Sequence, residues 1–150
     1  MKLCNPTGKG IRSDKQGDGH FGASRGNRTH QGLDFLCEPG QIVRAAISGK
    51  LSRSRPYHND TEYVGCGIWG KKYMVKMWYF TPYEDLIHDQ VKAGQEIGLA
   101  QDISQKYGGS MLPHIHLGLW SLEPTTLLNP EKYIIMITDK QIEKLKKGGF

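Results

Sequence analysis

The stretch that decides the fold of this chain is PHIHLGLW, residues 113–120. Apolar residues alternate with other residues along it, and this period of two predicts a β-strand. Residues two apart in a strand point to the same face of a sheet, so His114 and His116 should project together. Two imidazoles on one face bind a metal ion in some proteins and are ordinary surface groups in others.

The stretch NRTHQGLDF, residues 27–35, contains a second pair of metal-binding side chains, His30 and Asp34. We expect His30 to end a polar segment and Asp34 to begin a strand, with a turn between them. Zinc binds imidazole and carboxylate groups in tetrahedral geometry, and a catalytic zinc keeps one position open for water. His30, Asp34 and one of the two later histidines would fill three positions, and the other histidine would lie within reach of the open one. Either motif alone is a common surface pattern, and the metal site is predicted only from the two together.

The composition indicates a β-rich domain. The chain has 150 residues, of which 37% are hydrophobic and 19 are glycine. This length is typical of one domain, and low hydrophobicity with many glycines favours short strands joined by turns. The clearest further strand is YMVKMWYF, residues 73–80, because it is rich in β-branched and aromatic residues and is followed by Pro82. We therefore predict a mainly β fold.

The two ends of the chain differ from this pattern. Residues 1–29 are polar and rich in glycine, and we expect them to form an ordered arm. Near the C-terminus, Thr138 and Gln141 form a capping box and Gly148 is a stop signal, which predicts a short helix over residues 138–148. Arm, strands and helix are expected to make a single domain over residues 1–150.

Charge and cysteine content narrow the classes of function. The net charge is +5, but the basic residues lack interleaved aromatic residues or a nucleic-acid motif, so we expect a solvated surface and no nucleic-acid partner. No run approaches the ~20 apolar residues of a membrane span, and the N-terminus lacks the apolar run of a signal peptide. Cys4, Cys37 and Cys66 have no CxxC or zinc-finger spacing and allow at most one intramolecular disulfide.

Further segments extend the two metal-binding stretches in a fixed order. RTHQGLDF, PGQIVRAAISGKL, VKAGQEIG and PHIHLGLW together resemble the lysostaphin-type zinc endopeptidases, and the resemblance begins at residue 28 and ends near residue 133. It implies a compact antiparallel β fold, a bound Zn²⁺ ion and cleavage of peptide bonds in peptidoglycan. It also implies that His30, Asp34 and His116 are the zinc ligands and that His114 is a catalytic histidine beside them.

The first two thirds of the chain also resemble the leukocyte cell-derived chemotaxin-2 family. The similar segments are GDGHFGASRGNRTHQGLDFLCEPG, SRPYHND and YMVKMWYFTP. That family is regarded as one of signalling proteins that share the fold and the zinc ligands. The resemblance implies a disulfide between Cys4 and Cys37. It leaves Cys66 free, because Met74 stands where the family has another cysteine.

The chain departs from the endopeptidases just after residues 73–80. Those enzymes carry a further histidine in a WYxH context, whereas this chain reads WYFTP and has Thr81 at that position. Thr81 is therefore a candidate catalytic position, near which a donor would hold the oxyanion. The side chains that could substitute for the missing histidine are His58, His88, Tyr79 and Tyr83, with His20 on one wall of the cleft. The simpler interpretation of each is a surface or core residue.

The sequence leaves three hypotheses for the function. The preferred one is a zinc-dependent endopeptidase that hydrolyses peptide cross-links of peptidoglycan, outside the cell or in the periplasm, and acts as a monomer. The second is an inactive, zinc-stabilised module that binds a receptor or a glycan. The third, a β domain without metal, requires the order of the motifs to be a coincidence.

Overall fold

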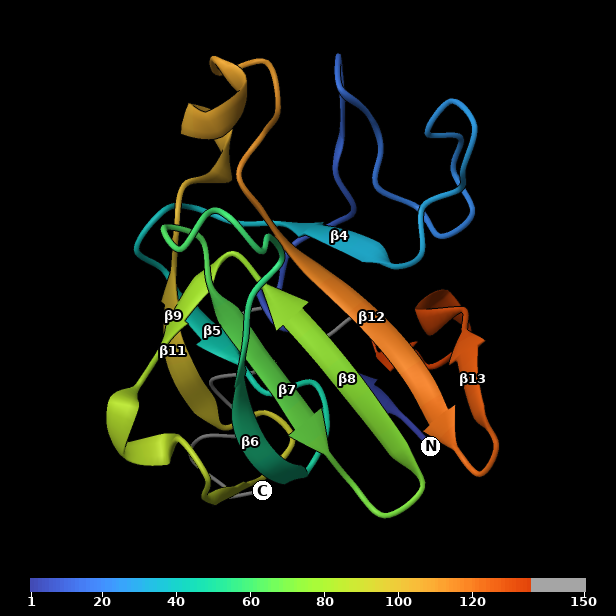
Figure 1. The fold of residues 1–150 in the computed structure, drawn as a ribbon, viewed down its shortest axis with the longest axis vertical. Helices are drawn as coiled ribbons and strands as arrows, with labels where there is room; N and C mark the ends of the chain where they lie inside the picture. Colours follow the sequence, from blue (N-terminus) through green and yellow to red (C-terminus); the bar gives the residue numbers. More distant parts are fainter. Residues whose placement is uncertain (136–150) are drawn as a thin grey trace.

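The structure is a computed structural model that describes residues 1–135. The helix predicted over residues 138–148 lies outside the described residues. Within them, most strands belong to one large and one small sheet, and loops with short helices cross over their ends (Figure 1). None of the helices in residues 1–135 is long and apolar enough to cross a membrane.

The large sheet has seven strands, and all of its pairs are antiparallel. Their order across the sheet is β10 (Gln90–Val91), β6 (Gly49–Ser54), β7 (Gly65–Trp69), β8 (Tyr73–Trp78), β12 (His114–Leu122) and β13 (Thr125–Leu128). The seventh strand, β4 (Leu33–Leu36), pairs with the first half of β12, while β13 pairs with its second half. The predicted mainly β, antiparallel fold is confirmed.

The remaining elements are short. An antiparallel small sheet contains β5 (Ile42–Arg44), β11 (Glu96–Ala100) and β9 (Phe80–Pro82). Two further pairs are β1 (Leu3–Cys4) with β14 (Ile134–Ile135), which are parallel, and β2 (Ser13–Asp14) with β3 (Gly17–Asp18). The described residues also include the 3-10 helices η1 (Glu84–Leu86), η2 (Ile103–Tyr107) and η3 (Pro130–Lys132).

Strand β12 confirms the alternation that predicted it. Ile115, Leu117 and Leu119 are fully buried in the core, and successive residues of a strand point to opposite faces, so His114 and His116 lie on the other face. A shift of register by one residue would turn the histidines into the core and the apolar side chains out of it. The packing of the core therefore fixes where the two histidines are.

The strand predicted over residues 73–80 is interrupted at Tyr79. β8 ends at Trp78, and Tyr79 has a φ of +79°, a left-handed conformation that bulky residues rarely adopt. Phe80 then begins β9 in the small sheet, where its side chain is fully buried. Residues 73–80 contain no glycine or proline, so the sequence carries no signal of this break.

The disulfide implied for Cys4 and Cys37 is absent, and that prediction is wrong: both cysteines are free, as is Cys66. The backbones of the two cysteines are hydrogen-bonded to different segments. The amide of Cys4 donates to the carbonyl of Ala46 at 2.9 Å, and the amide of Cys37 donates to the carbonyl of Pro113 at 3.1 Å. Burial raises the pKa of the Cys37 thiol to about 12, so this thiol is almost entirely protonated at neutral pH. Cys66 is free and buried, as predicted.

We predict that a chromogenic disulfide reagent will detect three thiols in each unfolded chain and will react only slowly with the native protein. The slow reaction follows from the burial of all three cysteines and from the raised pKa of Cys37. The measurement is a titration at pH 8, with and without guanidinium, on protein kept free of reductant. A single thiol in each unfolded chain would show that Cys4 and Cys37 are bonded.

Candidate metal centre

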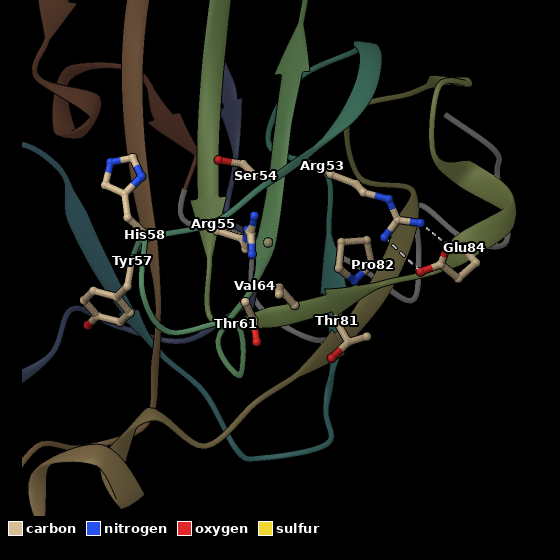
Figure 2. Close-up of a pocket in the computed structure, with 11 residues that line it drawn as sticks. Arg53, Ser54, Arg55, Tyr57, His58, Thr61, Val64, Thr81, Pro82 and Glu84 are labelled. Atoms are coloured by element: carbon tan, nitrogen blue, oxygen red, sulfur yellow. Dashed lines mark hydrogen bonds and ion pairs between the residues drawn. The ribbon is translucent and has the colours of Figure 1, made fainter.

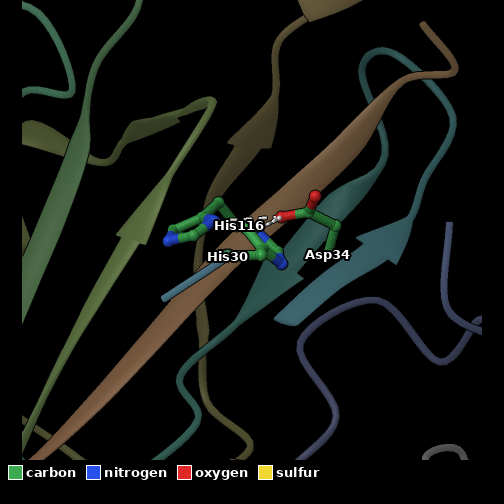
Figure 3. A group of neighbouring side chains, drawn as sticks. All are labelled: His30, Asp34 and His116. Carbon is green, nitrogen blue, oxygen red and sulfur yellow. Dashed lines mark hydrogen bonds and ion pairs between the residues drawn. The ribbon is translucent and has the colours of Figure 1, made fainter. Parts of the chain in front are cut away.

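The candidate ligands converge where β4 pairs with β12. The antiparallel register places Asp34 opposite His116. His30 lies in the loop before β4, and its ring reaches the same point (Figure 3). The ligand atoms of these three side chains all lie within 4.8 Å of one another. The structure thus brings together the three residues predicted to bind the metal.

Asp34 is the centre of this cluster. Its Oδ1 lies 3.2 Å from Nε2 of His30 and 3.0 Å from Nδ1 of His116. Burial raises the pKa of Asp34, but hydrogen bonds from His116 and His30 outweigh it and hold the pKa well below its usual range. The carboxylate is therefore charged at neutral pH although it is buried.

Arg12 supplies the positive charge that compensates Asp34. Its Nε and Nη2 donate to Oδ2 of Asp34 at 3.2 and 3.1 Å, and its Nη1 donates to Asp14 at 2.8 Å. This contact occupies Oδ2 and leaves Oδ1 directed toward the two histidines. The role of Arg12 cannot be predicted from the sequence, because a partner 22 residues away along the chain leaves no local pattern.

The polar arm, residues 1–29, holds Asp34 through the backbone as well. The amide of Arg12 donates to the carbonyl of Asp34 at 2.9 Å, and the amide of Asp34 donates to the carbonyl of Gly19 at 2.9 Å. A Cβ atom on Gly19 would lie 2.8 Å from Cβ of Asp34. Glycine is therefore needed where the arm approaches β4 so closely.

Contacts outside the cluster orient the two histidine rings. Nδ1 of His30 donates to the carbonyl oxygen of His20 at 3.0 Å, which turns Nε2 toward Asp34. The ring of His116 stacks on Trp78, with 5.3 Å between the centroids and 15° between the planes. Gly32 also lies against this ring, since a Cβ atom there would be 2.5 Å from Cε1 of His116. Such support is typical of histidines that bind metals.

His114 lies beside the cluster, in the position predicted for a catalytic histidine. Its Nδ1 donates to the carbonyl of Leu112 at 2.8 Å, and its Nε2 lies 3.7 Å from Oδ2 of Asp34. Burial lowers the pKa of His114, so the ring is neutral at pH 7 and its Nε2 carries no proton. A general base requires this state.

The cluster faces a cleft of about 330 Å³. Tyr79 lines it and meets His114 edge to face, with 5.2 Å between the ring centroids. Its hydroxyl is 3.3 Å from that of Tyr57, which is 3.1 Å from that of Tyr107. Burial raises the pKa of Tyr79 to about 12, so the hydroxyl keeps its proton. The sequence favoured a core position for Tyr79, but the left-handed turn places it in the wall of the cleft.

Thr81, the other candidate catalytic residue, does not lie in this cleft. It is exposed on β9 and lines a separate, larger pocket together with Arg55 and Pro82 (Figure 2). The break at Tyr79 accounts for the difference, because the chain turns into the small sheet directly after it. The structure therefore does not bring Thr81 to His114.

The other substitutes for the missing histidine also lie elsewhere. His58 lines the larger pocket. The ring of His20 is hydrogen-bonded to Glu131, and only its backbone carbonyl contacts the cluster, through His30. His88 and Tyr83 are not among the described residues that line the cleft.

The donor set fits a zinc ion. Two imidazole nitrogens and one carboxylate oxygen are ligands that zinc takes, and three protein ligands are the number found at catalytic zinc sites. Zinc also requires neutral histidines and an ionised carboxylate. Because Nδ1 of His30 is engaged by His20, its Nε2 is the nitrogen directed at the cluster, and Asp34 is ionised.

Known proteins share this sequence pattern and this fold. No family model matches the chain. Leukocyte cell-derived chemotaxin-2 from Bos taurus is 32% identical over 118 residues, which are 77% of this chain and 76% of the relative.

Among solved structures, the antimicrobial peptidase lysostaphin from Staphylococcus simulans matches 89% of this chain with a TM-score of 0.60 and 21% identity. A zinc-containing peptidase from Vibrio cholerae matches 85% with a TM-score of 0.54 and 18% identity. The chain spans 55% of the first protein and 39% of the second. These likenesses show that the fold is of the lysostaphin type.

We predict that Arg12→Ala will lower the free energy of unfolding by about 3–5 kcal/mol, because it leaves buried carboxylates without their cation. The measurement is guanidinium unfolding at pH 7 with a chelator present, so that bound metal does not contribute. Arg53→Ala is the control, since it breaks an exposed ion pair with Glu84, and its midpoint should match that of the wild type. Equal midpoints for the two variants would contradict the role given to Arg12.

Proposed function

The chain belongs to the leukocyte cell-derived chemotaxin-2 family. From its fold and its cleft, we propose that it is a zinc-dependent endopeptidase. The observation that carries the proposal is His114, a neutral ring beside the cluster whose Nε2 is free to accept a proton. A structural zinc site has four protein ligands and needs no base, whereas a catalytic site has three and a base nearby. The cluster with His114 matches the second description.

In this proposal His30, Asp34 and His116 hold the metal. A zinc ion at such a site lowers the pKa of coordinated water to about 7 and polarises the carbonyl group of a substrate. Arg12 fixes the carboxylate, and Trp78 fixes the ring of His116. These neighbours therefore hold the ligands in place before any metal binds, as residues around metal ligands commonly do.

His114 acts as general base and then as general acid. Its Nε2 takes a proton from the attacking water and returns a proton to the amine nitrogen as the C–N bond of the peptide breaks. The hydrogen bond from Nδ1 to the carbonyl of Leu112 keeps the ring oriented during both transfers. Help of this kind contributes typically about 10²- to 10⁴-fold to a rate.

Tyr79 supplies a hydrogen-bond donor on the other side of the reaction. Its hydroxyl stays protonated because burial raises its pKa to about 12, and its ring contacts that of His114. It donates to the carbonyl oxygen of the substrate as that oxygen gains negative charge. The hydroxyl of Tyr57 holds that of Tyr79 in position.

The substrate proposed is an extended peptide with small side chains. The cleft encloses about 330 Å³, and tyrosine, tryptophan and arginine side chains form much of its wall, so bulky residues have little room. The glycine- or alanine-rich peptides that cross-link peptidoglycan meet this requirement. The protein would then act outside the cell or in the periplasm, and as a monomer.

We predict that the protein binds one zinc ion per chain and that only the zinc-loaded form releases new amine groups from purified peptidoglycan. Elemental analysis gives the stoichiometry, and amine release is followed with and without a chelator. His116→Ala should lose zinc and activity together because it removes a ligand. His114→Ala should keep the zinc and lose the activity.

Two results would count against this proposal. If the wild-type protein took up no zinc, the whole proposal would be excluded. Release of amines by His114→Ala at the wild-type rate would show that another group is the base.

We predict that Tyr79→Phe will lower kcat about 100-fold, because one donor to the oxyanion is lost, while KM and zinc content stay the same. The matched control is Tyr57→Phe, which removes the hydroxyl next to that of Tyr79 and should lower kcat much less. Steady-state kinetics on a short alanine peptide measure both variants. An unchanged kcat in Tyr79→Phe would exclude Tyr79 from the reaction.

The second candidate is a zinc-stabilised binding or signalling module. Membership of the chemotaxin-2 family favours it, as does a tyrosine instead of a second histidine in the wall of the cleft. In that case the wild type hydrolyses nothing, and Tyr79→His gains hydrolysis. The substitution belongs at Tyr79 because Thr81 lies in another pocket.

A further inference from the structure

A larger pocket of about 660 Å³ adjoins the cleft. Tyr57 lines both spaces. In Figure 2, Tyr57 and His58 lie at one end of this pocket and the Arg53–Glu84 pair at the other, with Arg55 between the two ends. We call this space the Arg55 pocket.

The charges of the Arg55 pocket leave one cation without a partner. Arg53 is neutralised by Glu84, because its Nη1 and Nη2 donate to the two oxygens of that carboxylate. Glu84 is the only acidic side chain among the described residues that line the pocket. Arg55 makes no hydrogen bond and no ion pair with any other residue in the described part of the chain.

The groups around Arg55 complete an arrangement suited to a carboxylate. Thr61 and Thr81 place hydroxyl groups along the pocket, and Val64 and Pro82 give it an apolar surface (Figure 2). A guanidinium group offers parallel N–H donors that match the two oxygens of a carboxylate. The hydroxyl groups can donate further hydrogen bonds, and the apolar surface accommodates a small side chain beside the carboxylate.

We propose that the Arg55 pocket binds a carboxylate group of the peptide whose backbone lies in the cleft. The inference rests on the proposed function only in that the cleft holds a peptide. An extended chain covers about 3.3 Å per residue. The carboxylate therefore belongs to a substrate residue a few positions from the peptide bond that is cleaved beside His114. The pocket thereby makes the site selective for peptides that carry a negative charge on one side of that bond.

The test measures binding to the zinc-loaded full chain, in a His114→Ala background that prevents turnover. The probes are N-acetyl-tetraalanine with a free carboxylate, the same peptide as a C-terminal amide, and an amidated peptide with one glutamate. NMR titration gives each affinity, and the amide signals of Gly65 and Thr81 report on the Arg55 pocket. The free acid should bind about three- to tenfold tighter than the amide, as for an open, partly screened ion pair.

Matched variants assign that preference to Arg55. Arg55→Gln should bring the ratio of the two affinities to about one, while Lys50→Gln, the same change at an exposed residue of β6, should leave the ratio unchanged. The glutamate peptide distinguishes the sources: equal affinity to the free acid means that side-chain carboxylates are accepted, and affinity equal to the amide means that a chain end is required.

Several results would overturn the inference. They are equal affinity of acid and amide, a preference that survives Arg55→Gln, shifts confined to the cleft, or no binding of either alanine peptide. The proposed function fails in a different way, since absence of amine release from peptidoglycan leaves this affinity ratio unaffected. The two proposals can therefore be judged separately.

Discussion

The burial of the Asp34 carboxylate is the constraint on which the rest of this structure depends. An ionised carboxylate loses several kcal/mol when it is taken out of water without compensation. Here one oxygen receives two hydrogen bonds from Arg12, and the other faces His30 and His116. The two oxygens thus have different roles: Oδ2 is neutralised by a cation, and Oδ1 is directed at two imidazoles. That division makes the same carboxylate both stable and available to a metal.

This constraint explains why a polar, glycine-rich arm is ordered at all. Residues 1–29 bury few apolar side chains. Arg12 is nevertheless only 2% exposed, and its backbone is hydrogen-bonded to that of Asp34. The arm is held by the charge it compensates, and the cluster is held by the arm. Gly19 and Gly32 permit the close approach, because a side chain at either position would meet Asp34 or His116. Order in the arm and geometry at the cluster are therefore one property.

The sequence predicts the parts of this site that come from regularly alternating segments, and it misses the parts that depend on contacts between remote residues. Alternation over residues 113–120 gave the strand and the shared face of His114 and His116, and pairing with β4 brought Asp34 opposite. Arg12 left no local pattern, because its partner is remote in the chain. The break at Tyr79 was missed because the residues around it favour a continuous strand. The Cys4–Cys37 disulfide was carried over from relatives, and the positions alone did not guarantee the bond.

The left-handed turn at Tyr79 has consequences on both sides of it. Before the turn, Trp78 is still part of the large sheet, where it stacks on His116. After it, Phe80 enters the core of the small sheet, and Thr81 faces the Arg55 pocket. A straight strand would place Tyr79 and Thr81 on one face of the sheet and Trp78 on the other. Trp78 and Tyr79 could then not both line the cleft, as they do here. The turn at Tyr79 therefore places Trp78 beside the candidate metal centre and Thr81 in the neighbouring pocket.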